Sequence, residues 1–192
     1  MKTPAVILAA GASKRLGQPK QLIQIQGEPL LHRLGRIALD SCEPVLVVLG
    51  SEAGRMKAAL ADLPVQCARN LDWEEGMASS LRVAVSALPM DAEGAIFLVC
   101  DQPALDRDLL ERILRLHREH PDRRIASGYS GIRGTPAFLP CRDFDAMLQL
   151  HGDRGARDLL SDEQVLEVSF PGGELDLDLP EDLARLWARE RS

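Results

Sequence analysis

The chain has 192 residues and a net charge of −6, because 29 acidic residues outnumber 23 basic ones. Hydrophobic residues make up 45% of it, which fits one globular domain over residues 1–192 and excludes a disordered chain. The acidic balance and an aromatic content of only 4% argue against a nucleic-acid partner, which needs a basic face or stacking rings.

Two further features indicate a cytoplasmic protein with no membrane partner. No apolar run approaches the roughly eighteen residues of a membrane span, and the apolar stretch near Met1 is too short for a signal peptide. The cysteines are widely spaced and form no C-x-x-C pair, so neither a zinc ribbon nor a redox dithiol is expected. We expect small core residues in a reducing compartment: Cys42, Cys67, Cys100 and Cys141.

Short continuous apolar runs occur at residues 5–10, 44–50 and 94–100, with a more polar run at 64–69. Runs of this kind, bounded by turn residues, are typical of parallel strands that are buried on both faces. We therefore expect these four segments to lie side by side in one sheet.

Segments with helical periodicity separate the strands. Apolar stripes predict helices around residues 30–38, 77–88 and 109–117. A weaker helix is expected over 51–63, with Ser51 as its N-cap. Alternating strands and helices predict an α/β fold of three layers, a mostly parallel sheet with helices on both faces.

In such folds ligands bind beyond the carboxyl ends of the strands. The loops that follow residues 10, 50, 70 and 100 should therefore meet at one rim of the sheet.

The pattern changes after residue 123. Residues 123–140 resemble two extended pieces around a glycine-rich turn, which predicts antiparallel or mixed additions to the sheet. Two short helices, a late strand and a terminal helix that begins near Pro180 are expected to follow: 141–150, 156–162, 165–171 and 180–190.

The first loop, LAAGASKRLGQPK at residues 8–20, carries three cations and no acid. Its small residues let the backbone approach a ligand closely, and successive N–H groups can hold phosphate oxygens. The glycine spacing matches neither a P-loop nor a dinucleotide fingerprint. From these features alone, an exposed turn with solvated charges explains the loop equally well.

The longer stretch LAAGASKRLGQPKQLIQIQGEPLL resembles the nucleotidyltransferase pattern L-A-A-G-x-S-x-R-M-G-x-x-K-x-L-L, with Leu16 at the Met position. The resemblance implies a Rossmann-like fold of the nucleotide-diphospho-sugar transferase type. In that family Lys20 and Arg15 would contact the phosphates of a nucleoside triphosphate. The implied nucleotide-binding residues are Leu8, Ala9, Ala10, Gly11, Ala12, Ser13, Arg15, Lys20, Gly50, Asn70, Gly76, Ser80, Asp101 and Gln102.

Carboxylates at the same rim predict a metal site. Asp101 follows the strand 94–100, and Asp106 is better placed to cap the next helix, which leaves Asp101 free to bind Mg²⁺ through its oxygen atoms. Asp176 and Asp178 precede the terminal helix, where acids are common for electrostatic reasons alone. The ending LDLDLPEDL resembles D-x-D-T-P-E-D-L of the same superfamily, which favours Asp178 as the second metal ligand.

Three further segments resemble the molybdenum cofactor cytidylyltransferases: NLDWEEGMASSL, IRGTPAFLP and HGDRGARDLL. The first would line the base and ribose pocket, although Trp73 and Met77 also suit a core position at a helix start. The other two would hold the acceptor, through Gly134, Asp153 and Arg157. A guanidinium suits an acceptor phosphate.

The resemblance implies a catalytic set of Lys20, Arg15 and Asp101 that transfers CMP from CTP to the terminal phosphate of molybdopterin, with Mg²⁺ and release of pyrophosphate. A xanthine dehydrogenase-family apoenzyme is an implied further partner. The alternatives are another nucleotide, another acceptor such as a sugar 1-phosphate, a non-catalytic cofactor carrier, and a phospho-accepting regulator that uses Asp101. No histidine is needed, and we expect surface positions for His32, His117, His120 and His151.

Overall fold

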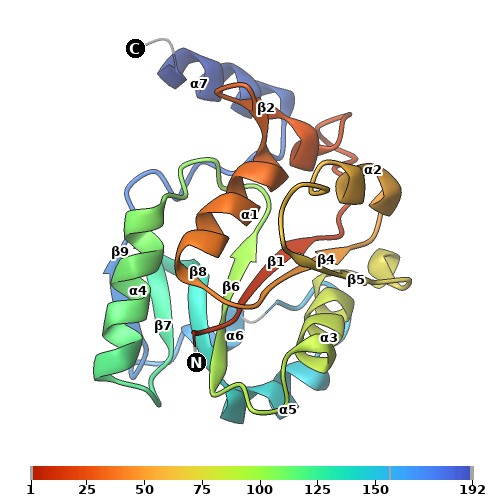
Figure 1. The fold of residues 1–192 in the computed structure, drawn as a ribbon. Helices are drawn as coiled ribbons and strands as arrows, with labels where there is room; N and C mark the ends of the chain where they lie inside the picture. Colours follow the sequence, from red (N-terminus) through yellow and green to blue (C-terminus); the bar gives the residue numbers. More distant parts are fainter. Residues whose placement is uncertain (1, 156, 191–192) are drawn as a thin grey trace.

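The structure, a computed structural model, describes residues 2–155 and 157–190. A seven-stranded sheet in the order β5-β4-β1-β6-β8-β7-β9 forms its centre, with a small β2-β3 sheet beside it (Figure 1). The strands are β1 (Ala5–Ala9), β2 (Gln24–Ile25), β3 (Glu28–Pro29), β4 (Val45–Leu49), β5 (Gln66–Arg69), β6 (Gly94–Val99), β7 (Ile125–Tyr129), β8 (Ile132–Pro140) and β9 (Leu166–Ser169).

The sheet has a parallel half and a mixed half. β1 pairs in parallel with both β4 and β6, and β4 pairs in parallel with β5. β8 runs antiparallel to both β6 and β7, and β7 is parallel to β9. The reversal occurs at a tight turn in which Ser130 and Gly131 have φ values of 47° and 75°, a conformation that glycine tolerates at Gly131. The predicted mixed character of this part is confirmed.

Helices cover both faces of the sheet. The α-helices are α1 (Leu30–Ser41), α2 (Ala53–Ala58), α3 (Met77–Ala87), α4 (Arg107–Glu119), α5 (Phe144–Leu148), α6 (Arg157–Leu160) and α7 (Pro180–Glu190). Alternate residues of β1 enter two different cores, because strand side chains point to opposite faces. Ile7 packs in the core of α1 and α4, whereas Val6 and Leu8 pack in the core that α3 supplies. The predicted three-layer α/β fold is confirmed.

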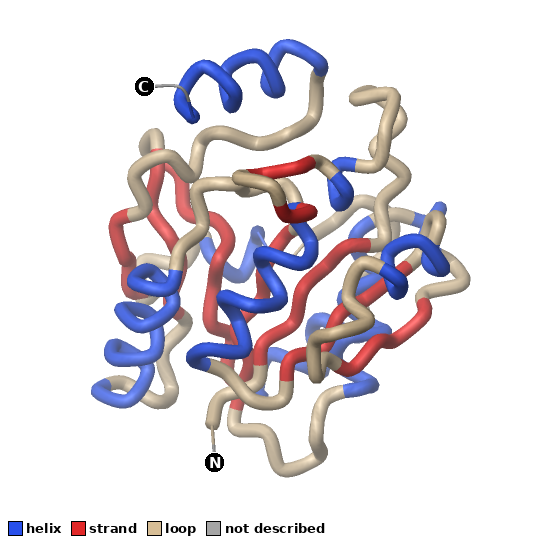
Figure 2. Tube along the Cα trace, turned by 45° about the horizontal axis from the view of Figure 1, so that its top comes forward, coloured by secondary structure: helices blue, strands red, loops and turns tan. Residues whose placement is uncertain are grey.

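The terminal helix α7 lies apart from these two helical layers, beyond the sheet at the end where β2 also lies (Figure 2). Leu183 and Leu186 on α7 join the apolar core of α1 and α4. The segment before α7 is attached to the sheet rim, because the Leu177 N–H donates to the Asp101 carbonyl at 2.9 Å. This attachment brings the carboxyl-terminal acids to the loop that follows β6.

The structure corrects three expectations. Ser51 does not cap α2, which instead follows Glu52 in a left-handed conformation (φ 50°) that makes no side-chain capping bond. Cys42 and Cys100 are buried, but Cys67 and Cys141 are exposed. His117 is not a surface residue, because its ring is buried and stacked on Phe138 with the centroids 3.8 Å apart.

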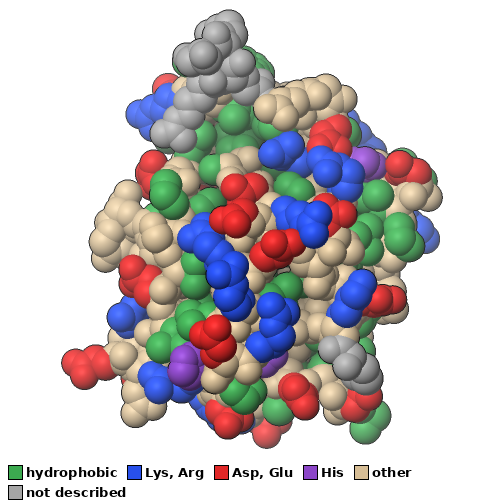
Figure 3. Space-filling model, turned by 60° about the vertical axis from the view of Figure 1, so that its left-hand side comes forward, with side chains coloured by type: hydrophobic (Ala, Val, Ile, Leu, Met, Phe, Trp, Pro, Cys, Tyr) green, Lys and Arg blue, Asp and Glu red, His purple; other side chains and the backbone are tan. Residues whose placement is uncertain are grey.

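Within the described residues, no helix is both long and apolar enough to cross a membrane. The face over α4 and β9 carries basic and acidic side chains in alternation rather than a patch of one sign (Figure 3). Several of these charges pair locally, as Arg107 does with Glu111 and Arg133 with Glu167. This face therefore has little net potential.

Candidate active site

The loops that follow the parallel strands meet at one rim, as predicted. The Ser51 N–H donates to the Ala10 carbonyl at 2.9 Å, and the Asn70 N–H donates to the Leu49 carbonyl at 2.7 Å. A cavity of about 690 Å³ opens there, a size typical of small-molecule sites. Its lining residues are Leu8, Ala9, Ala10, Gly11, Ala12, Ser13, Lys14, Arg15, Lys20, Gln21, Trp73, Glu74, Gly76, Met77, Ser80, Val99, Cys100, Asp101, Asp153 and Asp178.

The first loop is an ordered structure. Ser13 has a left-handed backbone (φ 52°), and its carbonyl accepts from Leu16 and Gly17 in a tight turn. The Ser13 hydroxyl accepts from the Lys20 N–H at 3.1 Å, which closes the loop onto its own end. At Gly11 a side chain would meet no protein atom within 4 Å. Because Gly11 has no side chain, this part of the cavity stays open to a ligand.

Gln21 supports this loop, a role that the sequence analysis did not predict. Its side chain is buried, and its amide donates to the carbonyls of Ala9 at 3.1 Å and Gly11 at 2.8 Å. These two hydrogen bonds fix the backbone of the loop at the cavity, which Gln21 itself also lines. The position directly after Lys20, in the short 3₁₀ turn Lys20–Leu22, was the only available signal.

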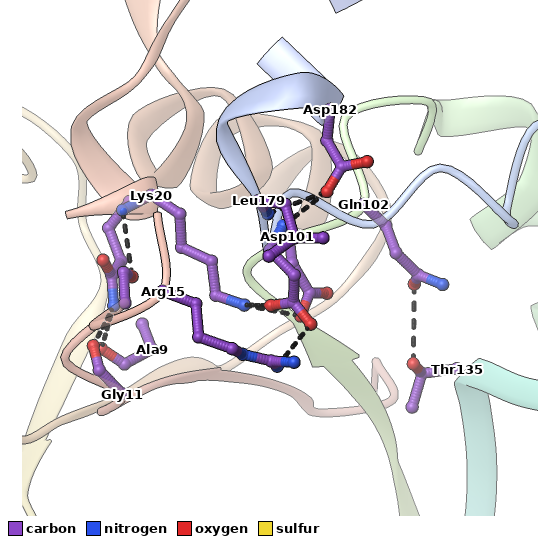
Figure 4. A network of polar contacts seen from close by, with 12 residues as sticks. Ala9, Gly11, Arg15, Lys20, Asp101, Gln102, Thr135, Leu179 and Asp182 are labelled. Atoms are coloured by element: carbon purple, nitrogen blue, oxygen red, sulfur yellow. Dashed lines mark hydrogen bonds and ion pairs between the residues drawn. The ribbon is translucent and has the colours of Figure 1, made fainter. Parts of the chain in front are cut away.

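Two of the three cations of the loop are paired with carboxylates from two distant segments (Figure 4). The Lys20 Nζ lies 2.9 Å from Asp101 and 3.0 Å from Asp178, and the Arg15 guanidinium lies 2.8 Å from Asp178. Lys20 is well shielded, with 16% of its side chain exposed, whereas 72% of the Arg15 side chain is exposed. Lys20 is therefore the central contact of the network.

The electrostatic environment keeps Lys20 charged. Burial opposes the charge, but the negative charges and hydrogen bonds of Asp101 and Asp178 outweigh it and raise the pKa of Lys20. Partial burial, followed by repulsion from Asp101 and Asp178, raises the pKa of Asp176 to about 7. Three acids thus share one region, and burial there favours the protonated form of Asp176.

A short structure before α7 holds Asp178 in place. The Asp182 carboxylate accepts from the N–H groups of Leu179 at 2.8 Å and Asp178 at 3.2 Å. An acid in the first turn of a helix is stabilised both by these free N–H groups and by the helix dipole. Asp182 is a supporting residue that the sequence reading missed, although the P-E-D-L motif contains it.

The carboxylates fit a divalent metal that also binds a substrate. The Asp101 Oδ1 atom is buried and has no hydrogen-bond partner, so it is free to act as a ligand. Among residues 2–155 and 157–190, no three His, Cys, Asp or Glu side chains form a complete metal cage. Mg²⁺ commonly binds through one or two carboxylates together with substrate phosphates. Asp101 and Asp178 match that arrangement.

The cavity brings together most of the predicted site residues. It contains the whole stretch Leu8–Ser13, both catalytic candidates of the first loop, both metal candidates, and part of the second motif. Asp153, which was expected on the acceptor side, lines the same cavity. The predicted residues found in its lining are Leu8, Ala9, Ala10, Gly11, Ala12, Ser13, Arg15, Lys20, Gly76, Ser80, Asp101, Asp153 and Asp178.

Gly50 and Asn70 lie behind the lining and not in it. A side chain at Gly50 would approach the Ala10 carbonyl and the Trp73 Cβ to 2.6 Å, so this glycine serves close packing. Asn70 is buried, and its amide donates to the hydroxyls of Ser79 at 2.8 Å and Ser80 at 3.0 Å. Asn70 therefore orients Ser80 and does not itself face the cavity.

Gln102 and Gly134 also lie outside the cavity lining. The buried Gln102 amide donates to the Tyr129 hydroxyl and to the Gly173 carbonyl, both at 3.2 Å, and its carbonyl accepts from Thr135 (Figure 4). A side chain at Gly134 would lie 2.3 Å from the Tyr129 hydroxyl. Both residues pack the junction of β6, β7 and β8.

Arg157 is exposed at the start of α6, outside the cavity. Its charge is nevertheless close enough to Tyr129 to oppose, in part, the rise in the Tyr129 pKa that burial and then Asp176 cause. Of the three acceptor candidates, Asp153 therefore lines the cavity, whereas Gly134 and Arg157 do not.

Comparison with known proteins gives close relatives over the whole length. The chain is 33% identical over 199 residues to the purine catabolism protein PucB of Bacillus subtilis, covering 95% of this chain and 96% of the relative. It is 32% identical over 195 residues to nicotine blue oxidoreductase of Paenarthrobacter nicotinovorans, covering 94% of each.

Two relatives are named for molybdenum cofactor synthesis. The molybdenum cofactor cytidylyltransferase of Escherichia coli is 26% identical, covering 97% of this chain and 95% of the relative. The molybdenum cofactor guanylyltransferase of Rhodobacter capsulatus is 28% identical, covering 100% of this chain and 98% of the relative. Both nucleotide specificities therefore occur among the relatives.

Solved structures share the fold. Rv0371c from Mycobacterium tuberculosis superposes with a TM-score of 0.82 at 28% identity, covering 98% of this chain and 99% of that one. A manganese complex of Rv0371c superposes with a TM-score of 0.81 at 26% identity, covering 97% and 98%. The MobA-like NTP transferase domain matches residues 5–168, and the chain thus belongs to this nucleotidyltransferase family.

Proposed function

We propose that this protein transfers CMP from CTP to the terminal phosphate of a molybdopterin-type cofactor, with Mg²⁺ and release of pyrophosphate. The observation that carries the proposal is the position of Lys20, whose Nζ lies within 3.0 Å of both Asp101 and Asp178 beside the small-residue loop. A cation between two potential metal ligands, beside a small-residue loop that lines the same cavity, suits a metal-bound polyphosphate.

The reaction forms one bond and breaks one. An oxygen of the acceptor phosphate bonds to the α-phosphorus of CTP, and the bond from that phosphorus to the β-bridging oxygen breaks. The second pKa of a phosphate monoester is about 6, so the acceptor is mostly dianionic at neutral pH and needs no general base. This explains why the mechanism uses no histidine.

The chain's own residues stabilise the charges of this reaction. Lys20 would donate to the α-phosphate as negative charge develops, and Arg15, which is exposed and paired with Asp178, would exchange that partner for the leaving pyrophosphate. The Ala10–Ser13 backbone would hold the remaining phosphate oxygens. Mg²⁺ held by Asp101 and Asp178 would neutralise triphosphate charge and orient it for in-line attack.

Different observations support the proposed nucleotide and the proposed acceptor. The LAAG and DQP sequences at residues 8–11 and 101–103 follow the cytidylyl pattern, which favours CTP over GTP. The acceptor proposal rests on the names of the cytidylyl- and guanylyltransferase relatives and on Asp153 beside the nucleotide cavity. A molybdenum hydroxylase of the xanthine dehydrogenase type is the proposed recipient of the product.

A panel of CTP, GTP, ATP and UTP with purified molybdopterin tests the proposal, with pyrophosphate release and mass spectrometry of the dinucleotide as readouts. We expect molybdopterin cytosine dinucleotide as the dominant product. Turnover with a sugar 1-phosphate and none with molybdopterin would reject the acceptor. Tight nucleotide binding without pyrophosphate release would instead support a cofactor carrier.

A further inference from the structure

One wall of the cavity is formed by two segments that are distant in sequence. The Ala78 N–H donates to the Gly152 carbonyl at 3.0 Å, and the Gly152 N–H donates to the Glu75 carboxylate at 3.3 Å. A side chain at Gly76 would lie 2.4 Å from an Asp153 carboxylate oxygen, so the segments touch there. The nucleotide-side loop and the turn around Gly152 therefore form one continuous surface.

A single guanidinium joins the two segments from behind. Arg82, on α3, donates through Nη1 to Glu75 at 2.9 Å and to the Leu150 carbonyl at 2.7 Å, and through Nη2 to the other Glu75 oxygen. Only 26% of the Arg82 side chain and 34% of the Glu75 side chain are exposed. A bidentate pair of this kind has a fixed geometry, because both partners are planar.

The pair remains charged at working pH. The hydrogen bonds from Arg82 lower the pKa of Glu75 to about 2. Neither residue lines the cavity, whereas their neighbours Glu74, Gly76 and Asp153 do. Glu75 and Arg82 therefore do not contact a ligand held in this cavity. Any effect they have on the reaction must act through the position of the lining residues beside them.

We propose that Glu75 and Arg82 are positioning residues that fix the acceptor-side turn, residues 150–153, at a set distance from the bound nucleotide. The proposal rests on the proposed function, because it assigns Asp153 to the side of a phosphorylated acceptor. Attack on the α-phosphorus requires the two substrates to be aligned. A displacement of about 1 Å in such a site can cost about a hundredfold in rate.

A purely structural role for Arg82 is the competing explanation, and the chain offers a matched control. Arg112, on α4, contacts Asp108 at 2.9 Å and donates to the Ser169 carbonyl in β9 at 2.9 Å, with 34% of its side chain exposed. It therefore fastens one element to another in the same manner, away from the cavity. Arg112→Gln measures the general cost of losing such a contact.

The experiment compares Arg82→Gln with Arg112→Gln in the full chain. Calorimetry gives the CTP dissociation constant without acceptor, and pyrophosphate release at varied molybdopterin gives kcat and KM. We expect Arg82→Gln to lower kcat/KM for molybdopterin by about tenfold or more, because misaligned substrates react slowly, while the CTP constant stays within about twofold. Arg112→Gln should change neither value. Equal effects of the two variants would overturn the proposal.

Two further variants and one structural readout complete the test. Because Glu75 and Arg82 act as a unit, the double variant Glu75→Gln/Arg82→Gln should be no worse than Arg82→Gln alone. Hydrogen exchange of residues 150–153 should accelerate in Arg82→Gln and not in Arg112→Gln. If the wild-type protein turns over no acceptor, the proposed function fails. Faster exchange of residues 150–153 in Arg82→Gln would then still support the positioning role of Glu75 and Arg82, and unchanged exchange would overturn it.

Discussion

The two sides of the cavity differ in whether their polar groups face it. On the floor, Lys20 pairs with Asp101 and Asp178, so the groups proposed to meet a ligand already contact each other. On the wall, the buried hydrogen bonds of Asn70, like the ion pair of Arg82, lie behind the lining. Under the proposed function, the floor would exchange its partners when a polyphosphate and a metal bind, whereas the wall would keep its partners.

Lys20→Ala should give the largest effect and tests the exchange on the floor. Loss of one charge-stabilising donor typically lowers kcat by about a hundred- to a thousandfold. The same variant should bind Mn²⁺ alone more tightly, since the ammonium no longer occupies Asp101 and Asp178. Calorimetry of the metal without nucleotide measures this, with Lys57→Ala on α2 as the control. Weaker metal binding in Lys20→Ala would contradict the exchange.

Asp101→Ala tests the proposed metal ligand on the same floor of the cavity. Asp101 has a buried oxygen with no partner, which we assign to the metal. We expect loss of all metal-stimulated turnover, comparable with the loss in Lys20→Ala, and no saturable Mn²⁺ binding by calorimetry. Near-normal turnover in this variant would remove Asp101 from the site.

Asn70→Ala tests the fixed character of the wall. It leaves the buried hydroxyls of Ser79 and Ser80 without a donor, which should reduce the free energy of unfolding by about 1–3 kcal/mol. Urea denaturation measures this loss. Ser86→Ala, an exposed position of the same helix, should be nearly neutral. An unchanged free energy of unfolding in Asn70→Ala would show that the wall repacks around the lost hydrogen bonds, and the contrast with the floor would disappear.

Gly11→Ala should affect binding and not folding. The added methyl group meets no protein atom, so stability should be unchanged, but it occupies space in the cavity. A cost of about 1–2 kcal/mol corresponds to roughly tenfold weaker CTP binding. Gly54→Ala, where a side chain also meets open space, is the matched control outside the cavity. Equal CTP affinity of both variants would mean that the nucleotide does not approach Gly11.

The smallest effect is expected far from both sides, at His117. Burial lowers the pKa of His117 below 6.5; the negative charge of Glu93 opposes this only in part, and Arg118 adds a smaller lowering effect. As the pH falls through 6.5, the unfolded chain takes up a proton that the folded chain resists, so stability decreases. His117→Phe should flatten this acid-side decrease in thermal melts between pH 7 and 5, and His120→Phe should not. A change in turnover at neutral pH would link this region to the cavity.

The parallel half of the fold was predictable because its strands are buried on both faces. The apolar runs that form β1, β4 and β6 are unfavourable on a protein surface, so they must be buried in the sheet. Parallel pairing then places their carboxyl ends at one rim. The weak helix after Ser51 was misplaced because its start depends on the left-handed Glu52, which no local pattern announces.

Part of the site was predicted from a resemblance and not from charge alone. The charges of the first loop and of the segment before α7 fit solvated positions equally well, and the motifs favoured Lys20 and Asp178, which the structure places in the cavity lining with Asp101. Asn70, Gln102 and Gly134 share a motif with site residues, but a motif does not reveal whether a side chain faces the ligand or the core. Gln21 and Arg82 were missed for the converse reason, since their partners are backbone carbonyls that only the fold brings near.

The pairing of Lys20 and Arg15 with Asp101 and Asp178 has a consequence for handling the protein. Two positive and two negative groups compensate one another, so the cluster can hold together without a bound metal ion. A metal that binds the folded protein raises its melting temperature by mass action. EDTA should therefore lower the melting temperature of a metal-loaded sample only to the value that these ion pairs support, and should not unfold the protein.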